Sequence, residues 1–173
     1  MKTADILLVS VRRRALKAGN FKAVEEHIRA GKPVIGIRTA NHAFSLRSLE
    51  PPKGHLVWEN FDAEVWGGSY TGHHGASKAV KIQKLSDHPI LEGIDVDTFK
   101  GRGSLYIVKP IADSTQAILS GMIDGEAAEP IAWTNETKFG GKTFYTSLGH
   151  VGDFEQRQMN IMLRNAIDWA VAK

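Results

Sequence analysis

Four short polar segments, each following an apolar run, hold most of the side chains that could do chemistry. They read RRR at 12–14, RTANH at 38–42, GGSYTGHH at 67–74 and GHVGD at 149–153. Ligands of open α/β sheets bind beyond the carboxyl ends of the strands, where the following loops meet. We therefore expect these segments to form one rim of a sheet, and this rim to carry the functional site.

Arg38 stands at the bend after the apolar run Val34–Ile37, where many α/β enzymes carry a nucleophile. A guanidinium stays protonated and is no nucleophile, and the absence of cysteine from the chain excludes a thiolate as well. At the head of a helical turn, Arg38 would add a cationic fork to outward-pointing backbone N–H groups. Its expected role is to bind an anion or a polarised oxygen. The alternative is a structural ion pair with a carboxylate such as Asp153.

Four histidines, at positions 42, 73, 74 and 150, belong to the same segments. Three imidazoles that converge with Asp153 or a water could hold Zn²⁺ or another divalent ion. Without a metal they could move protons near neutral pH. We expect catalytic roles for Arg38, His42, His73 and His150, and the candidate metal ligands are His73, His74 and His150. The sequence requires no cofactor beyond this candidate metal.

Neutral and charged polar groups complete the rim and are the expected substrate contacts. This set consists of Arg12, Arg13, Asn41, Tyr70, His74, Ser147 and Asp153. Such groups suit a sugar-like polyol, with Trp66 and Trp133 as flat apolar platforms; the alternative for each tryptophan is core packing. His27 is expected at the surface or a boundary, and His88 in a turn.

Composition limits the class of protein. The chain has 173 residues, a formal charge of +3 and 42% hydrophobic residues, as expected for one globular domain spanning 1–173. The basic run at 12–14 has no interleaved aromatic residues, so nucleic-acid binding is disfavoured relative to an anion-binding rim. No apolar run has the length of a membrane span, and the N-terminus lacks signal-peptide features. We expect a cytoplasmic protein, although a signal removed upstream would leave the same chain.

Apolar runs and turn residues predict alternating strands and helices. Predicted strands cover 4–11, 32–38, 63–66, 79–85, 104–108, 117–122, 130–134 and 143–148. Predicted helices run from an N-cap at Asn20 to Gly31, from Thr39 or Asn41 to Leu49, and over 153–172 with an Asp153–Gln156 capping box. The last helix has a predicted core stripe of Met159, Met162, Leu163, Ala166, Ile167 and Ala170. The pattern indicates a three-layer α/β sheet with helices on both faces and a small antiparallel extension.

Seven motifs in order resemble those of the ThuA-like (trehalose-utilisation) family, whose fold is similar to class I glutamine amidotransferases and flavodoxin-like sheets. They are LLVSVRRRAL, GKPVIGIRTANHAF, GGSYTGHHG, HPILEGI, GSLYIVKP, EPIAWTN and FYTSLGHVGDF, and they cover nearly the whole chain. The resemblance puts Arg38 where amidotransferases have their nucleophilic cysteine, and His150 near their triad histidine. Glutaminase activity is therefore excluded.

The resemblance further implies carbohydrate metabolism, with acid/base chemistry on a keto-disaccharide or related derivative by a hydrolase, lyase or isomerase. The alternative is a catalytically silent sugar-binding or partner-binding module of the same fold. Relatives begin with a β-α-β segment that this chain lacks before its first predicted strand. We therefore expect an unpaired sheet edge there, covered by a second copy in a homodimer.

Overall fold

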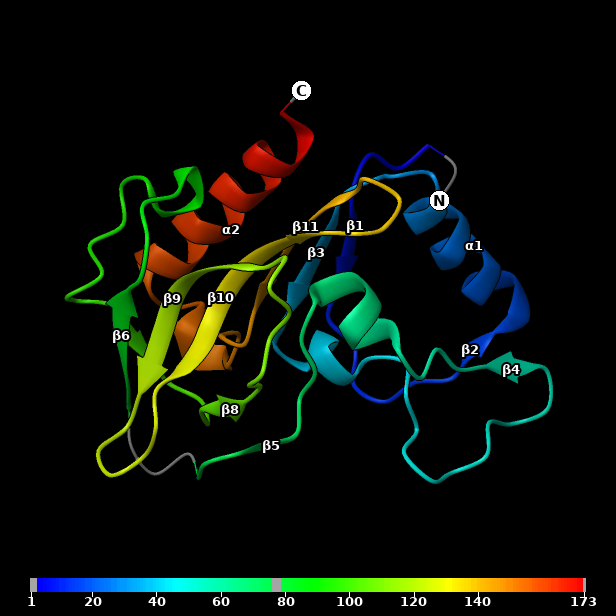
Figure 1. The fold of residues 1–173 in the computed structure, drawn as a ribbon, viewed down its shortest axis with the longest axis horizontal. Helices are drawn as coiled ribbons and strands as arrows, with labels where there is room; N and C mark the ends of the chain where they lie inside the picture. Colours follow the sequence, from blue (N-terminus) through cyan, green and yellow to red (C-terminus); the bar gives the residue numbers. More distant parts are fainter. Residues whose placement is uncertain (1–2, 76–78, 173) are drawn as a thin grey trace.

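The structure is a computed structural model that describes residues 3–75 and 79–172. Its main element is a seven-stranded sheet with the strand order β1-β3-β11-β10-β9-β6-β7 (Figure 1). These strands are β1 (Leu7–Val9), β3 (Val34–Ile37), β11 (Lys142–Thr146), β10 (Glu129–Glu136), β9 (Gln116–Met122), β6 (Val80–Lys84) and β7 (Lys100–Gly101). The first three are parallel, and the other four are added by antiparallel pairing. The expected parallel sheet with an antiparallel extension is confirmed.

Short elements surround this sheet and supply the loops at its rim. Two small antiparallel pairs join β2 (Leu16–Lys17) to β4 (His55–Leu56) and β5 (Gly72–His73) to β8 (Tyr106–Ile107). The helices are α1 (Ala18–Arg29) and α2 (Arg157–Val171). Single helical turns are η1 (Arg38–His42), η2 (Asp62–Trp66), η3 (Pro89–Leu91) and η4 (Val151–Asp153). None of the helices in the described ranges is long and apolar enough to cross a bilayer.

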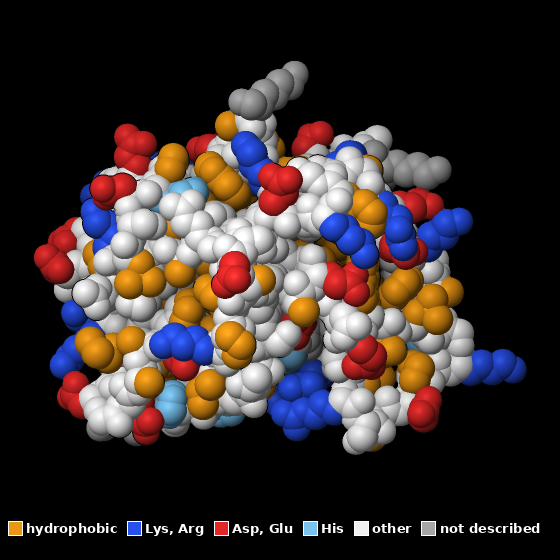
Figure 2. All heavy atoms as spheres, in the orientation of Figure 1, with side chains coloured by type: hydrophobic (Ala, Val, Ile, Leu, Met, Phe, Trp, Pro, Cys, Tyr) orange, Lys and Arg blue, Asp and Glu red, His pale blue; other side chains and the backbone are white. Residues whose placement is uncertain are grey.

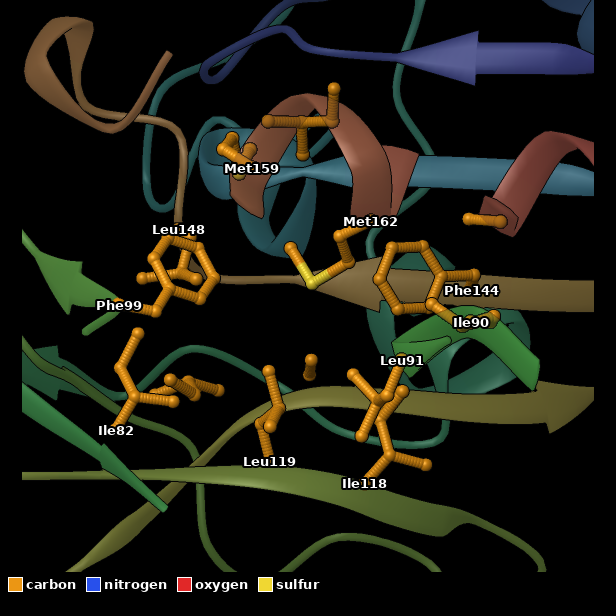
Figure 3. Packing of buried hydrophobic residues seen from close by; sticks show 14 of the residues in the cluster. Ile82, Ile90, Leu91, Phe99, Ile118, Leu119, Phe144, Leu148, Met159 and Met162 are labelled. Carbon is orange, nitrogen blue, oxygen red and sulfur yellow. The ribbon is translucent and has the colours of Figure 1, made fainter. Parts of the chain in front are cut away.

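The two helices cover opposite faces of the sheet, which makes three layers. On one face, Met159 and Met162 of α2 belong to one hydrophobic cluster with Phe144 of β11, and Met162 lies beside the Phe144 ring (Figure 3). On the other face, Val24 and Ile28 of α1 belong to a second cluster that includes Trp66 of η2. Because β3 is buried on both sides, all four of its residues are apolar or glycine. The expected flavodoxin-like layering is confirmed, with fewer helices than such sheets usually carry.

Three aromatic residues, Trp66 of η2, Trp133 of β10 and Tyr145 of β11, pack against one another beside β3. We call this cluster the aromatic wall. Each has 0% of its surface exposed, so the proposed role of the two tryptophans as sugar platforms is wrong and core packing is their function. The Trp66 indole N–H donates to the Ala40 carbonyl at 3.0 Å, and the Trp133 indole N–H donates to the Trp66 carbonyl at 2.7 Å. These bonds tie η1 and η2 to the sheet.

Several local predictions were wrong because tertiary contacts overrode the local pattern. Segment 63–66 is part of a helical turn, not a strand, and Gly67 ends it with a φ of 73°. Helix α1 begins at Ala18 without a side-chain cap from Asn20, whereas Gly31 has the expected left-handed backbone. His27 is buried, not superficial, and its Nε2 lies 3.0 Å from the Pro33 carbonyl.

The C-terminal helix starts later than predicted. The turn η4 precedes it, and the capping box joins His150 to Asp153 instead of Asp153 to Gln156. Ile167 is 41% exposed, so it does not belong to the core stripe that Met159 and Met162 form. His88 is a turn residue as expected, since its Nδ1 accepts from the Ile90 N–H at 3.2 Å.

Strand β1 is one of the two outer strands of the sheet and is next to β3 alone among the described strands. Leu8 in this strand is 52% exposed. An outer strand offers unpaired backbone groups that another strand can bind. The expected homodimer over this edge stays a prediction, because the structure contains one chain.

Gly36 in β3 offers a direct test of the aromatic wall. A Cβ at this position would lie 2.7 Å from Cζ2 of Trp66 and 3.0 Å from Cδ2 of Tyr145. We expect Gly36→Ala to lower the free energy of unfolding by about 1–3 kcal/mol, as overpacking does in well-packed cores. The matched control is Gly19→Ala in α1, where a Cβ meets nothing within 4 Å. Denaturant unfolding should show the control at or above wild-type stability. Equal stability of both variants would contradict the packing described here.

Candidate active site

Backbone hydrogen bonds bring the polar loops together at the carboxyl end of β3. The Arg13 N–H donates to the His42 carbonyl at 3.0 Å, and the Arg14 N–H donates to the Ala43 carbonyl at 2.7 Å. The Tyr70 N–H donates to the Asn41 carbonyl at 3.4 Å. Segments 12–14, 38–42 and 67–74 are therefore neighbours, as their positions after strands suggested.

Arg38 turns the chain sharply out of β3. Its φ is 48°, in the left-handed region that residues with a Cβ rarely adopt. The Tyr145 hydroxyl donates to the Arg38 carbonyl at 2.7 Å and so fixes the turn from the core. Gly149 approaches the same turn, and a Cβ there would lie 2.6 Å from Cγ2 of Ile37. The bend predicted from the sequence is thus present and held from two sides.

The Arg38 side chain is held by neutral groups. Its guanidinium donates to the Ser147 carbonyl at 3.1 Å and to Ser104 Oγ at 3.2 Å, and its Cζ lies 5.0 Å from the centre of the Tyr106 ring. Gly103 permits this position, since a Cβ there would lie 2.6 Å from the guanidinium NH1. Within the described part of the chain, Arg38 forms no ion pair.

Asp153, the expected partner of Arg38 or of the substrate, is instead an internal brace. It is fully buried, and its Oδ2 accepts from the N–H groups of Gly149 at 2.7 Å and His150 at 2.8 Å. Its Oδ1 accepts from the Arg102 N–H at 2.7 Å. The carboxylate therefore shapes the loop after β11 and does not face a ligand.

Aromatic rings connect four of the predicted site residues around Tyr106. The ring of His42 lies 4.5 Å from that of Tyr70 and 5.9 Å from that of Tyr106. Tyr70 lies 4.7 Å from Tyr106, and its hydroxyl is hydrogen-bonded to Nδ1 of His73. Arg38, His42, Tyr70 and His73 thus form one cluster. Tyr106 was not among the predicted site residues, although it lies in a predicted strand and in the motif GSLYIVKP.

His42 is the most perturbed imidazole of the cluster. It is 6% exposed, and burial is the main cause that lowers its pKa to about 4, followed by the charges of Arg13 and Arg12. Its Nδ1 has no hydrogen-bond partner among the described residues. The ring is therefore neutral at physiological pH and keeps one nitrogen available.

Asn41 beside it lies next to the Tyr145 hydroxyl, with which it interacts without ideal hydrogen-bond geometry. The side chain is fully buried, and neither its Oδ1 nor its Nδ2 forms a well-directed hydrogen bond within the described ranges. Buried amides almost always have partners in folded proteins. A buried amide and a buried imidazole without well-directed partners are adjacent in this turn. Such arrangements lower stability and are expected at functional sites.

A polar cavity of about 290 Å³ opens beside His42. Its lining consists of Arg13, His42, Ser45, Arg47, Glu59, Asp62, Ser69, Tyr70 and Thr71. Figure 2 shows Lys and Arg side chains gathered in a hollow at the lower middle of this face. Ser45 donates its hydroxyl to Glu59 and so keeps that carboxylate on the cavity wall.

Asp62, at the start of η2, is the second perturbed group of the cavity. Burial raises its pKa to about 7, a shift that the charge of Arg13 opposes and that of Glu59 supports. A carboxyl group with this pKa exchanges protons near neutral pH, as general acids and bases do. Sequence reasoning missed Asp62 because it placed the adjacent residues in a strand. The helical spacing of Asp62, Val65 and Trp66 was the available signal.

The remaining predicted histidines lie apart from this cavity. Side chains alternate along a strand, so His73 contacts Tyr70 while His74 turns to Glu126, with 3.5 Å between Nδ1 and Oε2. His150 is exposed, and its Nδ1 accepts from the Gly152 N–H at 3.2 Å. In the described ranges these imidazoles do not converge, and no group of three metal-binding side chains occurs there. The residues do not fit the expected zinc site.

The other predicted contacts divide into two groups. Arg12 is exposed at the rim, close enough for its charge to lower the pKa of His42. Ser147 is 3% exposed and contacts Arg38 through its carbonyl. Arg13 and Tyr70 line the cavity, whereas Ser147 does not and contacts Arg38 instead.

Comparison with known proteins agrees with the motifs. A family model described as trehalose utilisation (ThuA) matches residues 1–170. A ThuA-like protein from Bacteroides uniformis ATCC 8492 has a TM-score of 0.73 and 20% identity, over 99% of this chain and 71% of that one. A β-galactosidase from Bacillus circulans sp. alkalophilus has a TM-score of 0.66 and 13% identity, over 99% of this chain and 23% of that one.

A cytoplasmic protein from Salmonella typhimurium LT2 is also similar, with a TM-score of 0.61 and 12% identity over 96% of this chain and 71% of that one. At these identities the solved structures show a shared fold. No curated protein matches the sequence.

The opposite shifts of His42 and Asp62 predict opposite pH dependences of stability. Between about pH 4 and 6.5, the unfolded chain binds a proton at His42 that the folded chain refuses, so this group makes stability rise with pH. Between pH 3.8 and about 7, the folded chain keeps a proton on Asp62 that the unfolded chain releases, so this group makes stability fall with pH.

Denaturant unfolding across this pH range separates the two contributions. Relative to the wild type, Asp62→Asn should gain stability as pH rises, and His42→Gln should lose stability as pH rises. His55→Gln, which lies outside the cavity, is the matched control. Stability differences that stay constant with pH for both cavity variants would show that neither group is perturbed.

Proposed function

The chain belongs to the trehalose-utilisation (ThuA) family, and on that basis we propose that its rim cavity performs acid/base chemistry on a carbohydrate derivative. One observation carries the proposal. A neutral His42 and a carboxyl group, Asp62, whose pKa is about 7 line the same cavity. Two groups whose surroundings push their pKa values in opposite directions are typical of an acid/base pair.

Each residue has a role that follows from its state. His42 is deprotonated and accepts a proton through its unpartnered Nδ1 or through Nε2. Asp62 supplies or takes up a proton near neutral pH. Arg13 and Arg12 stabilise negative charge that develops on a substrate oxygen, as in an enolate next to a carbonyl. This chemistry suits a keto sugar, whose carbonyl acidifies the neighbouring C–H bond.

Tyr70 and His73 give the cavity a route for protons to solvent. Tyr70 lines the cavity, and its hydroxyl is bonded to Nδ1 of the exposed His73. A hydroxyl that donates on one side can accept on the other, so the pair can pass a proton outward.

Arg38 acts next to this cavity. Two of its five N–H groups are engaged by Ser147 and Ser104, which leaves three for a polarised oxygen. Its contact with Tyr106 also fixes the ring on which His42 and Tyr70 pack. In this proposal, His150 caps η4 and takes no part in the reaction.

A binding module without catalysis is the second candidate function. Two β-galactosidases favour this candidate, because the matching fold covers 23% of each of their chains and is therefore one part of a larger enzyme. Such a module would hold a sugar in the same cavity and release it unchanged.

Turnover assays on native and keto-disaccharides, with elemental analysis of the purified protein, test the proposal. His42→Gln and Asp62→Asn should each reduce kcat by roughly 10²- to 10⁴-fold, the usual contribution of a general acid or base. His55→Gln should retain wild-type rates. Saturable binding without conversion would favour the binding module, and unchanged rates in both cavity variants would remove their proposed roles.

A further inference from the structure

Three residues other than glycine have a left-handed backbone conformation in the described ranges, and all three are arginines. Arg13 and Arg38 have a φ of 48°, and Arg47 has a φ of 60°. Side chains with a Cβ avoid this conformation, and such strain collects at functional sites. Arg13 and Arg47 line the cavity, and Arg38 adjoins it through Tyr106. Three arginines around one site therefore have a strained backbone conformation.

The arginines at the cavity lie close enough for their charges to interact, as Arg13 and Arg47 show. Partial burial lowers the pKa of Arg13, and the charge of Arg47 lowers it further, so like charges are held close together. In the part of the chain that the structure describes, Arg12, Arg13 and Arg47 form no ion pairs. The cavity also contains Glu59 and Asp62. Glu59 accepts from the Ser45 hydroxyl and is in no ion pair with these arginines among the described residues, and Asp62 is largely protonated below its pKa of about 7.

A buried and unpartnered nitrogen points to a ligand in the same place. His42 lines the cavity, is 6% exposed, and has no hydrogen-bond partner for Nδ1 among the described residues. Buried polar atoms are normally satisfied by protein or by a bound group. Backbone bonds from Arg13 to His42 and from Arg14 to Ala43 hold the cationic loop against this ring.

We propose that the cavity binds an oxyanion, and that the substrate is an anionic sugar derivative, either a sugar phosphate or a sugar acid. This inference rests on the proposed function and narrows its substrate class. Guanidinium groups recognise phosphate and carboxylate in the same way, through paired N–H donors. The volume of about 290 Å³ is at the lower end of ligand cavities, roughly 300–1,000 Å³, and suits one sugar unit better than two.

Binding measurements that need no turnover test this proposal. Calorimetric titration at fixed ionic strength compares glucose, glucose 6-phosphate and gluconate. The anionic sugars should bind at least ten-fold more tightly than glucose, and the stronger of the two identifies phosphate or carboxylate as the preferred group. Equal affinities for glucose and both anionic sugars would overturn the proposal.

Glycine variants separate ligand binding from stability. Arg13→Gly and Arg47→Gly remove a side chain and also suit the left-handed backbone, so both should unfold at or above the wild-type temperature. Each should weaken binding of the preferred anionic sugar at least ten-fold. Arg164→Ala, at an exposed position of α2, is the control and should bind like the wild type.

The outcomes distinguish this inference from the proposed function. Anion-selective binding that both glycine variants lose supports the inference even if no substrate is converted. An equal loss of binding in the Arg164→Ala control would reveal general charge attraction and overturn it. Turnover of a neutral keto sugar that depends on Asp62, without preference for anions, would also overturn it and leave the proposed function standing.

Discussion

The left-handed turn at Arg38, tied to a buried aromatic wall, is the constraint on which the site depends. Tyr145 holds the carbonyl of Arg38, and Trp66 holds the carbonyl of Ala40, both from inside the core. Gly36 lets the indole of Trp66 lie against β3. Because the backbone is fixed at these points, the following residues Asn41 and His42 are buried at the rim with polar atoms unsatisfied. The sheet thus supports a turn that would otherwise be unfavourable.

Electrostatics follow from this placement. The same loop contact that buries His42 brings Arg12 and Arg13 beside it, so burial and charge both favour the neutral ring. Asp62 lines the same cavity, and its burial outweighs the attraction of Arg13 and keeps its proton to about pH 7. Burial lowers the pKa of His42 with the help of the basic loop and raises the pKa of Asp62 against it, so two groups that line one small cavity are shifted in opposite directions.

Much of the architecture could be predicted from the sequence because apolar runs mark buried strands and the loops after them. The bend at Arg38 and the neighbouring position of His42 followed from this pattern. The place of Asp62 in the site did not follow from it. The Trp66 indole donates to the Ala40 carbonyl and the Trp133 indole donates to the Trp66 carbonyl, and these contacts hold the segment of Asp62 in a helical turn. Asp153 looked like a rim residue, yet its carboxylate accepts from two N–H groups of its own loop and from the distant Arg102 N–H. His74 adjoins His73 in sequence but points away because strand side chains alternate.

The most direct measurement of the central claim is a pH titration followed by NMR of the His42 ring and the Asp62 carboxyl carbon. The structure predicts midpoints at about 4 for His42 and about 7 for Asp62, with Asp62→Asn and His42→Gln used to assign the signals. Midpoints at the ordinary values of 6.5 and 3.8 would contradict the account, because the cavity would then hold no tuned acid/base pair.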